Sequence, residues 1–229
     1  MICTVHQPNY LPYLGFFEKA SASDIFVIYD TTQFKKNDWQ NRNRICTAEG
    51  WQWITVPIIH SFGQKINEVK IDHSKKPLKN NWNKIQTVYG KAPYFKLYSE
   101  IFENIYKSEF ENISDLNCEI IYAFSRIFML KTKFIKSSGL LPIETKSTQA
   151  LIDICKAVGA DTYISGSEGK NYLEIGLFEQ AGIKLEFQQY KHPVYTQFNN
   201  ADFQPYMSAI DLIFNHGIHS LDILLNKTR

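Results

Sequence analysis

The sequence has no apolar run close to the roughly 20 residues that a membrane-spanning helix needs. Its first residues also lack the basic stretch and the long apolar segment of a secretory leader. We therefore expect no membrane insertion and a cytoplasmic location. The net charge of +2 over 229 residues is too small to indicate a nucleic acid as partner.

Cysteine motifs and metal-binding patterns are missing as well. The four cysteines are scattered and form no CxxC pair, which is typical of free thiols in a reducing compartment. Among the six histidines only His216 and His219 lie close together, and this weak signal predicts no metal site. Neither a GxSxG nucleophile elbow nor a GxxxxGK[ST] phosphate loop occurs.

What the sequence does contain is typical of one globular α/β domain. Hydrophobic residues make up 44% of the chain and charged residues 21%, and no repeat or long linker divides it. Residues 2–5 and 25–29 have the pattern of buried strands, with a Pro-punctuated loop and a helix at 16–23 between them. This arrangement predicts a parallel pair of strands, and ligands of open α/β sheets bind at the carboxyl ends of such strands.

The rest of the chain predicts a helical insertion and then a return to α/β alternation. Residues 51–59 suit a strand at a sheet edge, because Pro57 lies near its end, and 66–71 could pair with it. Helical spacing of apolar residues predicts an insertion over about 78–131. Strands are expected at 134–137, 162–165 and 185–188, and helices at 147–158, 172–180, 208–215 and 220–225. We predict a single α/β domain over 1–229.

Polar residues gather in four loops, and the first loop follows the first strand. A loop that leaves a parallel strand and enters a helix directs free backbone N–H groups at a ligand. His6 could act there as a proton donor or acceptor near neutral pH. Gln7, Asn9 and Tyr10 are the candidate binding residues. The alternative is that these residues only shape a tight crossover.

The second loop is basic. Arg42 and Arg44 are two residues apart, so on an extended segment they point the same way and could hold a phosphate or a carboxylate. Trp39 offers a face for a base or a sugar ring. The alternative is a solvated basic loop. The candidate binding residues of this loop are Lys35, Trp39, Asn41, Arg42, Asn43 and Arg44.

The third loop lies between a strand and a helix. Two glycines among hydroxyl groups predict a backbone nest that binds an anion, and Lys170 adds a positive charge. The alternative is a plain glycine-rich turn. The candidate binding residues are Ser165, Gly166, Ser167, Gly169, Lys170 and Tyr172.

The fourth loop, residues 190–197, contains His192, which the proline after it holds in an extended conformation. His192 could be a second catalytic acid or base, with Tyr195 as a binding residue, or both could be structural. Nearer the end of the chain, Asp211, Asn215 and His216 are interpreted as structural.

Together these loops resemble the WbqC-like family. The resemblance rests on residues 6–15 (HQPNYLPYLG), 39–44 (WQNRNR), 51–53 (WQW), 165–167 (SGS) and 190–195 (YKHPVY), and it extends to residues 211–215. That family occurs in bacterial gene clusters for O-antigen and other surface polysaccharides. The resemblance therefore implies a pathway more firmly than a chemistry.

The opening segment is also similar to that of adenylate-forming enzymes such as pantothenate synthetase, which implies a HUP/nucleotidyltransferase-like core. Those enzymes hold the phosphates of ATP with a His-x-Gly-His type signature. Here His6 is present, but Phe16 follows Gly15 where a second histidine would be expected. The turn at 165–170 could stand where such folds keep a second phosphate loop.

Three functions follow as hypotheses. The first is a transferase or ligase that acylates or aminoacylates the amine of a nucleotide-linked amino sugar. Arg42 and Arg44 would bind the diphosphate, Trp39 or Tyr10 would stack, and His6 or His192 would remove the proton. The second is an adenylating ligase that uses ATP, and the third is a non-catalytic binding protein of the polysaccharide machinery. The sequence leaves ATP, an acyl donor and an oligomer open.

Overall fold

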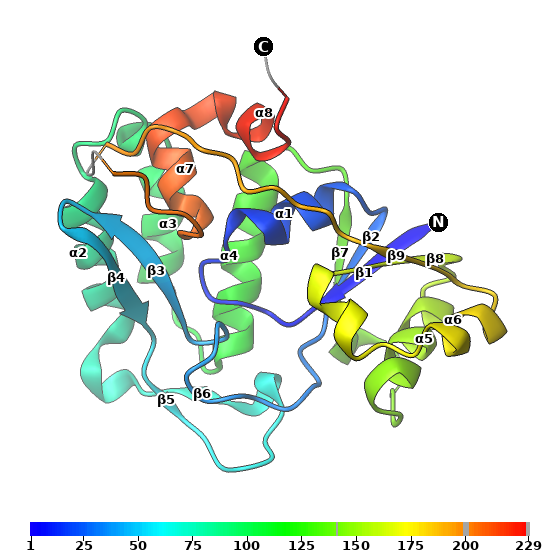
Figure 1. The fold of residues 1–229 in the computed structure, drawn as a ribbon. Coiled ribbons are helices and arrows are strands. Elements are labelled where there is room, and N and C mark those ends of the chain that lie inside the picture. Colours follow the sequence, from blue (N-terminus) through cyan, green and yellow to red (C-terminus); the bar gives the residue numbers. More distant parts are fainter. Residues whose placement is uncertain (141, 199–201, 228–229) are drawn as a thin grey trace. The chain divides into compact units, whose positions relative to one another are not determined.

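A computed structural model describes residues 1–140, 142–198 and 202–227 (Figure 1). Within these limits the chain divides into two compact units. The sheet unit consists of Met1–Gln7, Gly15–Thr31 and Leu130–Lys191. The helical unit consists of Pro8–Leu14, Thr32–Met129 and His192–Arg229. A single domain over 1–229 stays a prediction.

The sheet unit is built on a five-stranded parallel sheet in the order β7-β2-β1-β8-β9 (Figure 1). The predicted crossover is confirmed, because β1 and β2 pair in parallel and α1 lies between them in the chain. The α/β class with a parallel sheet is thus confirmed. The strands are β1 (Ile2–His6), β2 (Ile25–Ile28), β7 (Lys133–Lys136), β8 (Thr162–Ser165) and β9 (Lys184–Phe187), and the helices are α1 (Leu14–Ser21), α5 (Ser147–Ala157) and α6 (Ile175–Gln180).

Alternation along the strands gives each face of the sheet its own helices. Val5 on β1 belongs to an apolar cluster that includes residues of α5 and α6. Phe26 on β2 contacts Phe16 of α1, with ring centroids 4.7 Å apart. Thr4 pairs with Phe26 and so shares its face, and His6 follows two residues later. The His6 ring is therefore presented on the α1 side, where its centroid lies 5.0 Å from that of Phe16.

The order of the strands reverses at β1. From β1 the chain moves outward to β2 and β7 on one side, and it returns on the other side to form β8 and β9. A reversal of this kind leaves a crevice at the carboxyl ends of the two strands where it occurs, and open α/β sheets bind ligands there. The loops that begin after His6 and Ser165 leave these two neighbouring strands, β1 and β8.

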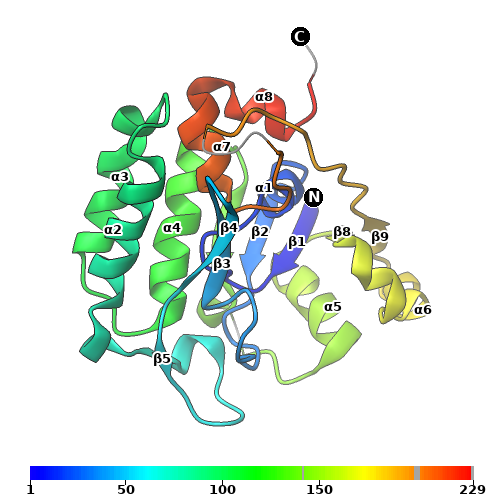
Figure 2. The same ribbon diagram turned by 60° about the vertical axis from the view of Figure 1, so that its left-hand side comes forward.

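The helical unit contains the predicted helices (Figure 2), with α3 packed against both α2 and α4. Each has an apolar inner face; in α3 this face includes Phe102, Ile105 and Tyr106. Helix α7 packs on α3 and carries Phe214, whose ring centroid lies 4.9 Å from that of Phe95. The helices of this unit are α2 (Pro77–Tyr89), α3 (Phe95–Lys107), α4 (Ile113–Ile127), α7 (Ala209–His216) and α8 (Ser220–Leu224).

Two antiparallel strand pairs belong to the same unit, and they correct the sequence expectations. Strand β3 (Arg42–Thr47) pairs with β4 (Gly50–Thr55), and β5 (Ile58–Ile59) pairs with β6 (Lys70–Ile71). The single strand expected at 51–59 is wrong, because Pro57 cannot donate to a ladder and the chain forms two strands around it. β3 was not expected as a strand. Short 3₁₀ turns are η1 (Ile66–Glu68), η2 (His73–Lys75), η3 (Ser137–Gly139), η4 (Ser167–Asn171) and η5 (Gly217–His219).

The helices are short. Across the described ranges, none is both long enough and apolar enough to cross a membrane.

Candidate functional site

An aromatic and cationic surface covers one face of the β3–β4 hairpin in the helical unit. Residues that pair directly across a hairpin share a face, and Arg44 pairs with Trp53. Arg42 and Trp51 lie two residues away along their strands, on the same face. Trp39, from the loop before β3, contacts Trp53. We call these five residues the Trp–Arg platform.

The rings and guanidinium groups of the platform alternate in space. The guanidinium carbon of Arg42 lies 4.3 Å from the ring centre of Trp53. That of Arg44 lies 5.1 Å from Trp51 and 5.6 Å from Trp39. The exposed fractions of Trp39, Trp51 and Trp53 are 40%, 42% and 36%. Indoles are usually well buried, so this surface is suited to a flat ring that carries negative charge.

The opposite face of the hairpin is interior and holds the loop after Gln7. Asn43 donates from Nδ2 to the carbonyl groups of Tyr10 (3.0 Å) and Leu11 (2.8 Å). Leu11 has a φ of 44°, a left-handed conformation that is unfavourable for its side chain, so these bonds fix a strained turn. Asn41 donates to the carbonyl of Val56 at 3.1 Å. Both asparagines are buried and bind backbone, which corrects their prediction as substrate-binding residues.

Two more residues predicted to bind substrate are also interior. Tyr10 is fully buried, and its hydroxyl group lies 2.6 Å from that of Tyr106 and accepts from Asn81 Nδ2 at 3.0 Å. Burial raises the pKa of Tyr10. Asn9 is buried too. Buried polar groups need internal partners, so the stacking role predicted for Tyr10 is wrong.

His192 is joined to the platform through Tyr206. The backbone N–H of Tyr206 donates to His192 Nε2 at 3.1 Å, and the carbonyl of Tyr206 accepts from Arg44 at 3.5 Å. His192 Nδ1 lies 2.8 Å from the carbonyl of Pro193, so Nδ1 carries the proton. Tyr206 is half exposed, has a φ of 60° and lies 6.4 Å from Tyr13 between ring centroids.

The contacts of His192 differ from those of a free acid or base, and its catalytic role stays a prediction. Both ring nitrogens already bind backbone groups of the same unit, and burial lowers the pKa of His192. The ring has no lone pair left to take a proton from a substrate. Instead His192 holds Tyr206 in its strained conformation beside Arg44. The second and fourth predicted loops thus meet, through a tyrosine that the sequence did not indicate.

Tyr195, the other candidate of the fourth loop, is an anchor. Its buried hydroxyl group donates to Asp211 Oδ2 at 2.9 Å, and Gln197 Nε2 donates to the same oxygen at 2.9 Å. Asp211 is fully buried in α7, and burial raises its pKa to about 6. This carboxyl group therefore fastens the extended segment that begins at His192. Asp211 has the structural role expected of it, and Tyr195 shares that role.

In the sheet unit, His6 stands at the carboxyl end of β1. Its Nδ1 lies 2.9 Å from the carbonyl of Gln7, so this nitrogen carries the proton and Nε2 has its lone pair free. Burial, together with the nearby charge of Lys19, lowers the pKa of His6 to about 3. The ring is therefore neutral at physiological pH. It can accept a hydrogen bond or a proton, but it is not a proton donor near neutral pH, which corrects part of its predicted role.

Lys19 is a residue of this region that the sequence interpretation missed. Its side chain is 3% exposed, Nζ donates to the carbonyl of Val5 at 3.2 Å, and Nζ lies 6.0 Å from the ring centre of Phe26. Burial lowers the pKa of Lys19 to about 7. Lysines are almost never fully buried unless they are paired, and a perturbed pKa of this kind is common at functional sites. The signal in the sequence was its position three residues after the apolar Phe16 in the expected helix, because residues three apart lie on the same helix face.

The third predicted loop forms the 3₁₀ turn η4 and not the predicted nest. A nest needs a left-handed residue, but Gly166 has a φ of −61° and residues 165–172 include no positive φ. A Cβ on Gly169 would lie 2.1 Å from Ser165 Oγ and 3.0 Å from Leu173 Cδ1, so a larger residue there would force these side chains to shift. Lys170 is exposed, with Nζ 5.5 Å from the ring centre of Phe187.

The predicted residues thus fall into two groups by unit. The sheet unit holds His6 and the η4 turn, where Ser167 and Tyr172 are exposed and Gln7 is partly buried. The helical unit holds the platform and the His192 segment, with Lys35 exposed in the loop before Trp39. Trp51 and Trp53 were not predicted as binding residues. Their spacing of two on a strand was the signal that they share a face with the arginines.

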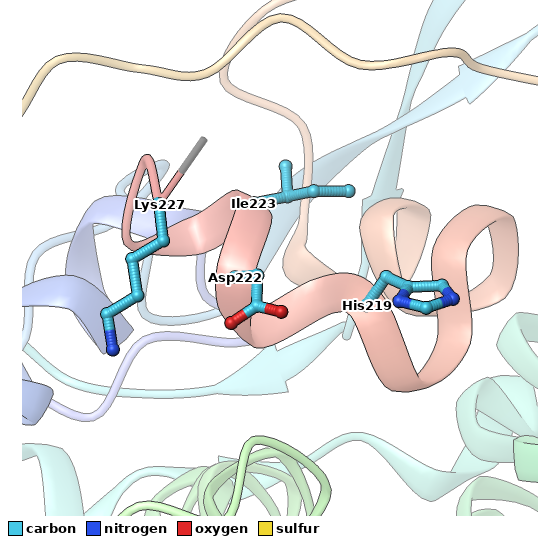
Figure 3. Close-up of a pocket in the computed structure, with 4 residues that line it drawn as sticks. All are labelled: His219, Asp222, Ile223 and Lys227. Atoms are coloured by element: carbon cyan, nitrogen blue, oxygen red, sulfur yellow. The ribbon is translucent and has the colours of Figure 1, made fainter. Parts of the chain in front are cut away.

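A shallow hollow of about 340 Å³ lies on the last helical stretch (Figure 3), lined by His219, Asp222, Ile223 and Lys227. All four come from one short stretch of chain, and none belongs to a predicted loop. Over the residues that the structure describes, no group of three or more His, Cys, Asp or Glu side chains is placed to hold a metal ion.

Comparison with known proteins agrees with the resemblance in the sequence. The profile of the WbqC-like protein family matches residues 7–223, which include the platform, the η4 turn and the His192 segment. The chain is also 33% identical over 222 residues to uncharacterized protein Rv1507c of Mycobacterium tuberculosis (strain ATCC 25618 / H37Rv), with 95% of each chain covered. The chain belongs to the WbqC-like protein family.

Proposed function

We propose that this protein is an enzyme of bacterial surface-polysaccharide (O-antigen) biosynthesis that transfers an acyl or aminoacyl group to the amine of a nucleotide-linked amino sugar. The observation that carries the proposal is the Trp–Arg platform. A nucleotide-linked sugar joins a flat base and a sugar ring through a diphosphate. Guanidinium groups bind phosphate oxygens in pairs, and indoles stack on rings. The family resemblance supports the pathway.

Arg44 supports the binding of an anion on this surface. Its Nε is covered by neighbouring atoms and has no acceptor among the described residues. Burial also lowers the pKa of Arg44. A covered N–H without an acceptor is unfavourable, and a phosphate oxygen would supply the acceptor once the atoms that cover Nε move aside. Tyr206, held beside Arg44 by His192, would then limit which ligands fit.

The proposed chemistry forms an amide. The sugar amine attacks the acyl carbon, the bond to the leaving group breaks, and the nitrogen loses a proton. His6 stays a candidate proton acceptor within the sheet unit, because its Nε2 is unprotonated at neutral pH. This assignment rests on the state of the ring alone, and it has its own test. In a working assay, His6→Asn should lower kcat by at least tenfold and leave sugar-nucleotide affinity unchanged.

Binding is the first experiment. Titration with UDP-, dTDP- and GDP-linked sugars should quench tryptophan fluorescence, because three of the four tryptophans form the platform. Arg42→Ala and Arg44→Ala should each weaken binding about tenfold, for a charged contact of about 1.5 kcal/mol. Arg126→Ala, an exposed arginine of α4, is the matched control. If Arg42→Ala and Arg44→Ala both bind sugar nucleotides as tightly as the control Arg126→Ala does, the platform is not the diphosphate site.

Turnover is the second experiment. The protein is incubated with nucleotide-linked amino sugars and either acyl-CoA compounds or ATP plus carboxylic acids, and products are detected by mass. A mass gain on the amino sugar supports the transferase. Tight binding without any product in the complete mixtures would favour the non-catalytic binding protein.

The strand order of the sheet unit favours a second candidate, an adenylating amide ligase. A parallel sheet that reverses at its first strand is the architecture in which nucleotides often bind, and the opening segment resembles HUP/nucleotidyltransferase-like enzymes. This candidate requires pyrophosphate release that depends on both the acid and the amine. Absence of nucleotide turnover with every acid tested would remove it.

A further inference from the structure

The pairing of β1 with β8 ends before the pairing of β1 with β2. The pairing of β1 with β2 extends to His6, which lies opposite Ile28. Along β8, the pairing stops at Thr4 opposite Ile164. Both strands continue beyond that point, so they separate at the reversal of the sheet order. We call this place, formed by Val5, His6, Ser165 and Gly166, the β1–β8 split.

Lys19 fills a donor position at this split. Successive carbonyl groups of a strand point to opposite edges, and the His6 carbonyl accepts from Tyr29 on the β2 side. The Val5 carbonyl therefore points toward β8. It accepts from Lys19 Nζ at 3.2 Å, where a continued ladder would supply a β8 amide. An ammonium group has three N–H donors, and Val5 takes one of them.

The surroundings of Lys19 do not balance its charge. The titratable groups that interact electrostatically with Lys19 are Cys3 and His6 on β1 and Glu18 next to it on α1, and the ring centre of Phe26 on β2 lies 6.0 Å from its Nζ. Glu18 acts on Lys19 through its charge without forming an ion pair, and its carboxylate accepts a hydrogen bond from Gln188 Nε2. The ion pairs of the described residues do not include Lys19. A buried cation without an anion is unfavourable, which agrees with its lowered pKa of about 7.

The backbone beside the split is open. A Cβ added to Gly166 would meet no atom within 4 Å, so a ligand can approach the chain closely there. His6 keeps an unprotonated Nε2 on the neighbouring strand. The split therefore combines a buried cation with spare donors, an open backbone and a neutral imidazole, at the place where parallel sheets bind ligands.

We infer that the β1–β8 split is a binding site for an oxyanion group, the phosphate or carboxylate of a small molecule, and that Lys19 supplies its positive charge. The inference goes beyond the proposed function and does not depend on it, because it concerns the sheet unit and any oxyanion of suitable size. It places the charge on Lys19 and not on the exposed Lys170. Neutralising Lys19 would also remove part of the field that keeps the pKa of His6 low, so the bound anion would make His6 a better base.

The direct test follows the titration of Lys19 by NMR. Protein labelled with ¹³C at the lysine Cε is titrated over pH 5–10 with and without pyrophosphate, and the Lys19 signal is identified by its loss in Lys19→Met. Without anion the midpoint should lie near 7. Saturating pyrophosphate should raise this midpoint. The rise is about one pH unit for each factor of ten by which pyrophosphate binds the charged form of Lys19 more tightly than the neutral form. A midpoint that does not move at saturation overturns the inference.

Affinity gives an independent readout. Lys19→Met should weaken pyrophosphate binding at least tenfold at pH 7, and Lys156→Met, an exposed lysine of α5, should not. Unchanged affinity in Lys19→Met overturns the inference. Repeating the titration with succinate distinguishes a carboxylate site from a phosphate site. If Lys19→Met fails to fold, the wild-type NMR titration decides, with the Lys19 signal then assigned from Lys19→Arg.

The result is separable from the proposed function. Arg44→Ala changes the helical unit only, so it should keep the pyrophosphate response of Lys19 even if sugar-nucleotide binding is lost. If Lys19→Met loses pyrophosphate binding but still binds sugar nucleotides, the result supports both the platform as the sugar-nucleotide site and the β1–β8 split as the oxyanion site. Loss of the pyrophosphate response in Arg44→Ala would contradict the assignment of the anion to the β1–β8 split.

Discussion

Replacing Lys19 by methionine should stabilise the sheet unit below about pH 7. The pKa of Lys19 is about 7 in the folded protein against an ordinary 10.5, and one pKa unit corresponds to about 1.4 kcal/mol. Holding the charged amine in the fold is thus unfavourable by up to about 5 kcal/mol. Methionine fills a similar volume without charge. The lost hydrogen bond to Val5 removes about 1–2 kcal/mol, which leaves a net gain of about 3 kcal/mol.

The sign of the pH dependence follows from proton counting. Between pH 7 and 10.5 the unfolded chain binds more protons at Lys19 than the folded protein does, so this residue makes wild-type stability rise with pH. Lys19→Met lacks this contribution. The difference in free energy of unfolding between the two proteins should therefore be largest near pH 6 and should shrink toward pH 10.

The assay has to report on the sheet unit. All four tryptophans, at positions 39, 51, 53 and 82, lie in the helical unit, so their fluorescence does not report on the sheet. Urea unfolding is therefore followed by amide hydrogen exchange in peptides from β1 and β8, read by mass spectrometry. Lys156→Met is the control. A difference that is the same at pH 6 and pH 9, or a variant that is less stable at both, would refute the reasoning about Lys19.

Three further predictions concern the helical unit and use urea unfolding followed by tryptophan fluorescence. Gly217→Ala should lose about 2 kcal/mol, because a Cβ there would lie 2.2 Å from the Tyr94 ring at a φ of +54°; Gly63→Ala, which has a positive φ of +85° but no atom within 4 Å of the added Cβ, should lose less. The pKa of Asp211 is raised to about 6, so the free energy of unfolding should fall by about 3 kcal/mol as the pH rises from about 4 to 6. Asp211→Asn should remove this pH dependence, and an unchanged pH dependence in the variant would show that Asp211 is not its source. Asn43→Ala should lose about 2–3 kcal/mol by leaving two backbone carbonyl groups without a donor, and a loss below 0.5 kcal/mol would show that the turn does not need it.

The central strands of the sheet, β1, β2 and β8, were predictable because they are largely buried. Residues 25–28 form an unbroken apolar run, and 162–165 is bounded on both sides by turn residues, so local pattern alone locates them. Strand β3 was not predictable in this way. Its polar residues Arg42 and Arg44 point to the platform while Asn43 binds backbone inside, so the alternation is polar on both faces.

The arrangement of some candidate residues was predictable from the sequence, and the contacts of others were not. The first and third loops leave neighbouring strands, which the sequence did not predict, whereas Arg42 and Arg44 share one face as their spacing predicted. The role of His192 could not be read from its neighbours in sequence, because its Nε2 is used by Tyr206, which lies 14 residues away. Lys19 was missed because a lysine in a short helix is ordinarily exposed, and only the packing of α1 on the sheet buries it.

The order in which the sheet is assembled has a consequence for synthesis on the ribosome. Strand β1 lies between β2 and β8, and β8 is made roughly 160 residues after β1. During translation the first strand therefore waits with one edge unpaired until most of the chain has emerged. Because the sheet unit is assembled from three separate stretches, the nascent chain does not contain the complete unit until β9 has been synthesised. An unpaired strand edge is prone to association with other chains, so slow translation should increase the association of incomplete chains.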